Sequence, residues 1–225
     1  MRRSLRTVSV IIRLTPFVLA FLRDRRRFLL IGRPASRSER HHDRRARRLT
    51  KVLGRLGPTF IKLAQIFSAR ADILPEPYLA HIGTLQDQGP PDPWEEVVRV
   101  LESELGRPVR EVFDEFESEP LAAASLGQVY RARFRGEDVA VKVLRPGVED
   151  VVALDLEISF QFLFWLNVLF RNHHVRALTN LVREFSVRVK EEMDFRQEAE
   201  NMEVFRSFFP DPGPVRIPQV WEELS

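Results

Sequence analysis

The stretch Val139-Ala140-Val141-Lys142 says most about the architecture of this chain. Its branched side chains favour extended backbone, so it predicts a strand that ends in a lysine. A run of small residues, Ala122-Ala123-Ala124-Ser125, precedes that lysine by about eighteen residues. A small-residue loop lets the backbone approach phosphate oxygens, and a lysine ammonium on a nearby strand can pair with them. The pattern therefore indicates a nucleotide phosphate site.

Charge is distributed unevenly along the 225 residues. Residues 1–51 hold 15 Arg, 1 Lys and 3 acidic residues, a net charge of +13, whereas the remaining residues sum to −10. A basic arm of this kind suits an anionic membrane surface or a nucleic acid. The acidic remainder has no zinc-finger spacing and no RNP-like aromatic run, so we expect no nucleic-acid partner. Cysteine is absent and the histidines lack metal-ligand spacing, so no structural metal site is expected.

The first apolar stretch, Val8 to Leu22, is interrupted by Arg13 and Pro16 and is too short to span a bilayer comfortably. As a helix it places arginines on one face and apolar residues on the other: Arg2, Arg6 and Arg13 against Ile11, Leu14, Val18 and Leu22. This pattern predicts a peripheral helix in the membrane interface, on the cytoplasmic face, with arginines toward the headgroups. The alternatives are a basic helix that packs on its own domain and an organelle transit peptide.

The rest of the chain divides into helical and strand segments. Residues 23–48 read as a solvated linker or a short charged helix. Helices are predicted from Gly57-Pro58 to near Leu74-Pro75, from Pro77, over Trp94–Leu105, over 149–170 and from Ala177 to about Phe209. Alternation predicts a hairpin of Leu126–Phe134 and Val139–Leu144 around Arg135-Gly136-Glu137-Asp138, and a final strand starting at Ile217-Pro218-Gln219-Val220.

Lys142 requires a carboxylate partner if it is to be held beside phosphates. Glu198 lies on a later helical segment and is the candidate partner; Asp194, four residues earlier, is expected on the same helix face. The loop itself spans Ala122, Ala123, Ala124, Ser125, Leu126 and Gly127. Alanine restricts φ where glycine does not, so this loop should hold a nucleotide differently from a glycine loop. Taken singly, each feature also fits an exposed lysine, an alanine run or a solvated acidic face.

Four motifs in order give a specific resemblance. The segment Gly57-Pro58-Thr59-Phe60-Ile61-Lys62-Leu63-Ala64-Gln65, followed by Leu74-Pro75 and Leu85-Gln86-Asp87, resembles the helical extension of the UbiB family of atypical kinases, with its K-x-G-Q motif. The alanine-rich loop through Val129, the lysine strand, and an E-x-D motif at Glu192-Met193-Asp194 also match, with Glu198 as the lysine-pairing glutamate. Ala64 stands where the family motif has glycine.

The resemblance implies an α+β fold: a protein-kinase-like N-lobe with an N-terminal helical extension and without a C-lobe in this chain. Residues 1–51 are then a basic arm and linker, 52–118 the helical extension, and 119–225 the N-lobe. Lys142 and Glu198 would be catalytic, and residues 122–127 with Lys142 would bind nucleotide. The regulatory set would be Lys62 and Gln65 of the extension facing Glu192 and Asp194, which blocks the usual peptide groove.

The same resemblance implies an ATP-dependent atypical kinase or ATPase that uses Mg²⁺ and supports coenzyme Q biosynthesis or prenyl-lipid homeostasis. Expected partners are nucleotide, an anionic membrane surface or prenyl lipid, and other coenzyme Q biosynthesis proteins. The alternative is a non-catalytic, membrane-associated scaffold of kinase-like shape. Catalytic and metal-binding aspartates should follow the lysine strand. The H-x-D at His41-His42-Asp43 precedes it and Asp194-Phe195-Arg196 belongs to the E-x-D segment, so we expect this chain alone to be inactive.

Overall fold

The structure of the chain is a computed structural model that describes residues 2–25, 38–70, 76–85, 90–170, 173–209 and 215–224. It forms two compact units. The first comprises residues 1–91, 123–127 and 147–185, and the second comprises 92–122, 128–146 and 186–225. The predicted boundary at residue 51 lies inside a helix of the first unit. The predicted helix end at Leu74-Pro75 and the motif residues Gln86-Asp87 lie outside the described residues.

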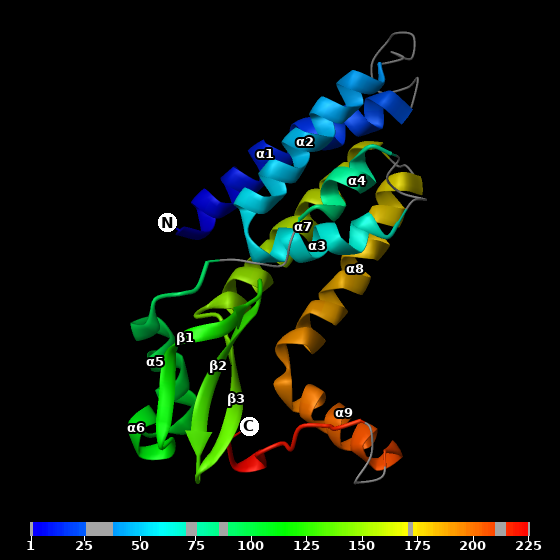
Figure 1. The fold of residues 1–225 in the computed structure, drawn as a ribbon. Coiled ribbons are helices and arrows are strands. Elements are labelled where there is room, and N and C mark those ends of the chain that lie inside the picture. The colour runs from blue at the N-terminus through cyan, green and yellow to red at the C-terminus, as the bar shows by residue number, and fades with distance from the viewer. Residues whose placement is uncertain are drawn as a thin grey trace. The chain divides into compact units, whose positions relative to one another are not determined.

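Helices make up the first unit (Figure 1). They are α1 (Arg2–Arg25), α2 (Glu39–Leu56), α3 (Pro58–Ser68), α4 (Tyr78–Gly83), α7 (Val148–Phe170) and the part of α8 (His173–Met193) up to residue 185. α1 lies along α2 and also contacts α7, while α2, α3 and α4 pack on one another. Gly57 separates α2 from α3 at φ 97°, a conformation that favours glycine, and Pro58 begins α3 as the sequence predicts.

A buried ion pair joins the two ends of the first unit's sequence. Asp155 on α7 has no exposed surface, and the Arg6 guanidinium donates to both of its carboxylate oxygens, at 2.8 and 2.7 Å. Arg6 also donates to the carbonyl of Leu56 at the end of α2. One arginine therefore links α1, α2 and α7.

The prediction that the arginine face of α1 points toward headgroups is wrong for Arg6. The buried Asp155 carboxylate requires a cationic partner, and Arg6 is that partner. The alternative of a basic helix packed on its own domain describes α1 as it stands in the structure. Of the two alternatives for residues 23–48, the charged helix is observed over residues 39–48, which belong to α2, while residues 26–37 lie outside the described part of the chain.

α3 ends earlier than predicted. Its last residue is Ser68, and the backbone N–H groups of Ala69 and Arg70 donate to Ile66 and Phe67, three residues back. The hydroxyl of Ser68 donates to the Gln65 carbonyl at 2.6 Å. Such tight bonds close the last turn and use carbonyls that further helical turns would need. α4 follows from Pro77, as predicted.

The second unit holds a three-stranded antiparallel sheet of order β1–β2–β3: β1 (Glu115–Ala123), β2 (Gly127–Phe134) and β3 (Glu137–Leu144). Two helices, α5 (Trp94–Leu105) and α6 (Val109–Val112), complete its core. α5 has the bounds predicted from its apolar spacing. Its buried residues Val97 and Leu101 pack with Tyr130, Phe134 and Val143 of the sheet.

The predicted hairpin of β2 and β3 is confirmed, with a two-residue turn at Arg135-Gly136. Both turn residues have positive φ, 54° and 81°, the backbone that suits the twist of a tight hairpin. The strand β1 was not predicted from the sequence. This strand carries alternating acidic residues and Pro120, which resemble a loop, but it pairs only with β2, and an edge strand tolerates proline.

The C-terminal region differs from the prediction in two places. The single long helix expected from Ala177 to Phe209 is divided into α8 and α9 (Phe195–Phe208) at Asp194. The residues 217–220, expected to begin a strand, lie in irregular backbone and lead into a short 3₁₀ turn at Glu222–Leu224. The partner strand that would hold them in extended pairing is not among the described strands.

We expect Arg6→Ala to lower the free energy of unfolding by about 3 kcal/mol, because it leaves the Asp155 carboxylate buried without its cation. Chemical denaturation followed by circular dichroism measures this change. Arg13→Ala, which removes an exposed arginine of the same helix, is the matched control and should change stability by less than about 0.5 kcal/mol. Equal effects of the two substitutions would contradict the role of the ion pair.

Candidate nucleotide site

The alternation of β3 sets the direction of Lys142. Val139, Val141 and Val143 pack against the core of α5 and the sheet, so their even-numbered neighbours project from the opposite face. Lys142 is one of these neighbours, and its side chain is exposed. The strand pattern thus places an ammonium on the open face of the sheet while burying the residues beside it.

Glu198 on α9 meets Lys142 on that face. The Glu198 carboxylate accepts a hydrogen bond from the Lys142 ammonium, as predicted. The ring of Phe195, one turn earlier on α9, lies 4.5 Å from the same ammonium, in the range of a cation–π contact. Both partners of the ion pair are about half exposed, 41% and 51%, so the cation is fixed in place and still accessible to a ligand. Phe195 was not identified from the sequence.

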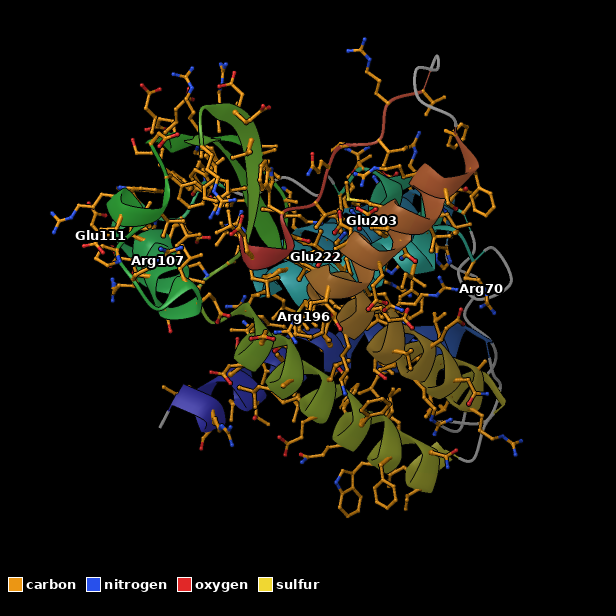
Figure 2. The ribbon with its side chains drawn as sticks, turned by 90° about the horizontal axis from the view of Figure 1, so that it is seen from below. Arg70, Arg107, Glu111, Arg196, Glu203 and Glu222 are labelled. Carbon is orange, nitrogen blue, oxygen red and sulfur yellow. The ribbon has the colours of Figure 1, made fainter. Side chains whose placement is uncertain are left out.

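Asp194 does not share a helix face with Glu198, contrary to the prediction. It is the residue immediately before α9, with extended backbone, and its carboxylate accepts the N–H of Arg196 at 3.1 Å. A short acidic side chain bonds readily to backbone N–H groups, which favours a helix start over a helix interior. α9 continues from this cap, and Figure 2 labels two of its residues, Arg196 and Glu203. The cap fixes the start of the helix that carries Glu198.

The alanine-rich segment is shorter as a loop than predicted. Ala122 and Ala123 belong to β1 and Gly127 begins β2. Three residues, 124–126, therefore connect the two strands; the N–H of Ala124 donates to the Gly127 carbonyl at 2.9 Å, and Ser125 and Leu126 are buried. The N–H of Ala124 is therefore used within the connection, and phosphate binding by the alanine-rich segment stays a prediction.

A buried polar cluster in the second unit was missed from the sequence. Gln128, 1% exposed on β2, accepts the N–H of Asp92 at 3.1 Å and donates to its carboxylate at 3.0 Å. Arg145, just after β3, donates to the same carboxylate at 2.8 Å. These contacts join the segment before α5 to two strands of the sheet. Neither periodicity nor a motif signals them, because the three residues are up to 53 positions apart.

Two pKa shifts belong to the strands of this sheet. Burial raises the pKa of the Tyr130 phenol, and the nearby Asp92 charge raises it further. The hydrogen bond and charge of Arg131 lower the pKa of the Asp138 carboxyl on the neighbouring strand, 2.9 Å away. The raised pKa of Tyr130 results from its position on the packed face of the sheet. The lowered pKa of Asp138 results from a cross-strand ion pair, which stabilises the hairpin that carries Lys142.

The predicted regulatory residues lie on different units. Lys62 and Gln65 are on α3 in the first unit, whereas Glu192, near the end of α8, and Asp194 are in the second. A contact between these pairs therefore stays a prediction, as does the placement of the alanine-rich connection over Lys142. The structure does bring Lys142 and Glu198 together within one unit.

Comparison with known proteins agrees with this arrangement. The ABC1 atypical kinase-like domain matches residues 84–225, well over half of the chain. The chain belongs to this family. The resemblance to UbiB-type atypical kinases and the α+β, kinase-like fold expected from it are thereby confirmed.

Several relatives of this ABC1-family chain are named kinases. Protein ACTIVITY OF BC1 COMPLEX KINASE 1, chloroplastic, of Arabidopsis thaliana is 41% identical over 182 residues, 80% of this chain and 27% of the relative. An uncharacterized aarF domain-containing protein kinase, chloroplastic, of the same plant is also 41% identical, over 84% of this chain and 27% of its own length. An uncharacterized protein of Synechocystis sp. is 41% identical, over 85% and 35%. The chain thus spans about a third or less of these relatives.

A solved structure also matches. The complex of Rv3197 with erythromycin from Mycobacterium tuberculosis is 30% identical, with a TM-score of 0.47, over 80% of this chain and 46% of that one.

We expect Lys142→Ala and Glu198→Gln each to lower the free energy of unfolding by no more than about 1 kcal/mol, because exposed ion pairs contribute little. Hydrogen exchange of α9 should nevertheless become faster in both variants, since the helix loses a contact with the sheet. Arg131→Ala is the matched control: it removes an exposed ion pair of the hairpin and should leave α9 exchange unchanged. A loss of several kcal/mol, or unchanged exchange in α9, would contradict this role.

Proposed function

We propose that the second unit binds ATP, with Lys142 pairing with the nucleotide phosphates and Glu198 holding Lys142 in place. The observation that carries the proposal is the Lys142–Glu198 pair on the open face of β3. A lysine from this strand, fixed by a glutamate from a neighbouring helix, is the arrangement that kinases use to position phosphates. Membership of the ABC1 atypical kinase-like family supports it.

The activity proposed for the whole protein is that of an ATP-dependent atypical kinase or ATPase. Mg²⁺ would accompany ATP, since phosphoryl transfer relies on a metal that bridges the phosphates. In this sequence no H-x-D motif follows Lys142, and Asp194, the candidate in a D-F-x motif, caps α9 with its carboxylate. We therefore propose that residues 1–225 alone bind nucleotide weakly and do not turn it over, and that the metal-binding and catalytic aspartates belong to the part of the relatives that this chain does not span.

The physiological role proposed is support of coenzyme Q biosynthesis or prenyl-lipid homeostasis at a membrane. The supports are the UbiB-type motifs and relatives whose names refer to activity of the BC1 complex. Other coenzyme Q biosynthesis proteins are the proposed protein partners. In the proposed regulation, Lys62 and Gln65 of α3 approach Glu192 and Asp194 and close the groove against peptide substrates.

We expect MgATP to produce chemical-shift changes in the NMR spectrum of residues 1–225 that centre on β3 and the start of α9. Lys142→Ala should abolish these changes, because the phosphates lose their cation. Lys190→Ala, which removes an exposed lysine of α8, is the charge-matched control and should preserve them. Shifts that survive Lys142→Ala would contradict the proposal, and ATP turnover by this chain would contradict its proposed inactivity.

A second candidate function, a membrane-associated scaffold, is favoured by one observation on α1. Its exposed side carries the apolar residues Leu5, Val8, Ile12 and Leu19, opposite the face that packs on the protein. With the net charge of +13 over residues 1–51, this side suits the interface of an anionic membrane. The apolar stripe differs from the one predicted, since Leu14 and Val18 are partly covered.

One helix in the described part of the chain is long and apolar enough to cross a membrane on length and composition alone. It is α7, over Val148–Leu169, and about a third of that window is buried inside the structure. Val152, Leu156, Leu163 and Leu166 belong to the core of the first unit. This packing favours a core helix with an exposed apolar end, at Phe164, Trp165, Val168 and Leu169.

We expect residues 1–225 to bind anionic liposomes in a sedimentation assay, and binding to weaken as salt rises, because salt screens the surface potential. The double variant Leu5→Ser, Ile12→Ser should reduce binding severalfold. Phe208→Ser, which removes an equally exposed apolar side chain from α9, is the control. Absence of binding to any vesicle would eliminate the interfacial role of α1, and equal binding to neutral vesicles would eliminate the role of its charge.

A further inference from the structure

The first unit contains an apolar cavity of about 370 Å³ that is partly open to solvent. Helices α1, α2, α3, α4, α7 and α8 all contribute to its wall, which is mostly aliphatic and aromatic. Protein interiors pack densely, and voids larger than a water molecule are few. A cavity of this size is instead within the range of sites that hold small molecules.

The wall restricts the chemistry of an occupant. Arg45 of α2 is the one charged residue among those that line the cavity in the described part of the chain. The hydroxyls of Tyr78 and Ser159 are its other polar side-chain groups, and the Ser159 hydroxyl already donates to the Asp155 carbonyl. An apolar wall with a single cation fits a molecule that is hydrocarbon along most of its length and negatively charged at one end.

We propose that this cavity is a binding site for a single-chain anionic amphiphile of the fatty-acid class. The hydrocarbon chain lies among the apolar side chains of the helices, and the carboxylate pairs with the Arg45 guanidinium. This site is separate from the nucleotide site, because all of its lining residues belong to the first unit.

One wall of the cavity is the buried face of α3. Phe60, Leu63 and Ala64 line it, and Ala64, which stands in the glycine position of the K-x-G-Q-like motif, is 1% exposed. Lys62 and Gln65 of the same helix are not among the lining residues. A bound amphiphile therefore contacts α3 on the face away from its two polar motif residues, and the extra methyl group of alanine adds to the apolar wall.

Fluorescence of cis-parinaric acid, a fatty acid that emits in apolar surroundings, tests the proposal with purified residues 1–225. We expect a single saturable emission increase, displaced by dodecanoate more effectively than by dodecanol because only the former has a charge for Arg45. Arg45→Ala should weaken dodecanoate about tenfold, a loss typical of one charge-assisted hydrogen bond. Arg44→Ala, a change at the exposed neighbour on α2, should leave it unchanged.

Leu163→Trp tests the location, because a larger side chain at this buried lining residue fills the cavity. It should abolish the saturable signal, whereas Phe164→Trp at the exposed neighbour should preserve it. Far-ultraviolet circular dichroism shows whether each variant is folded. If Leu163→Trp does not fold, the dodecanoate affinity of Arg45→Ala tests the location of the site. Non-saturable emission, loss only in Phe164→Trp, or equal displacement by dodecanoate and dodecanol would overturn the assignment.

Discussion

The Lys142–Glu198 ion pair is the interaction on which the second unit is organised. It requires that β3 bury its valines on one face while holding an ammonium on the other, and that α9 begin where Glu198 reaches that ammonium. The valine alternation meets the first requirement, and the Asp194 cap meets the second. The pair itself adds little stability, so the core of the sheet holds β3 in place, whereas α9, which has no buried residue, meets β3 through Glu198 and Phe195.

The first unit also contains an ion pair between distant segments, but here the carboxylate is buried. Asp155 is fully enclosed, and a buried carboxylate is costly unless it is paired and hydrogen-bonded. Arg6 satisfies both of its oxygens, so the basic N-terminal segment is part of the helical fold as well as a source of positive charge. α1 consequently has two apolar sides, one against the protein and one exposed at Leu5, Val8 and Ile12.

The alanine-rich segment shows how this chain departs from a glycine loop. Its connection is only three residues long, with Ser125 and Leu126 buried and the Ala124 N–H bonded to Gly127. Free N–H groups in such a segment can approach phosphate oxygens, and in this chain the N–H of Ala124 is already bonded within the connection. In the nucleotide site that we propose, Lys142 is the cation that pairs with the phosphates, and its fixation by Glu198 is the central feature.

Local patterns along the chain were enough to predict α5, the hairpin and the lysine strand, because apolar spacing and turn residues act over a few positions. The order of motifs added the Lys142–Glu198 pair across 56 positions. Other features arise between residues whose sequences carry no shared signal. Arg6 and Asp155 are 149 positions apart, β1 is a strand only because β2 pairs with it, and the cavity exists only where six helices meet. Tertiary packing alone decides which of these residues are buried, and a buried polar group is stable only with a partner.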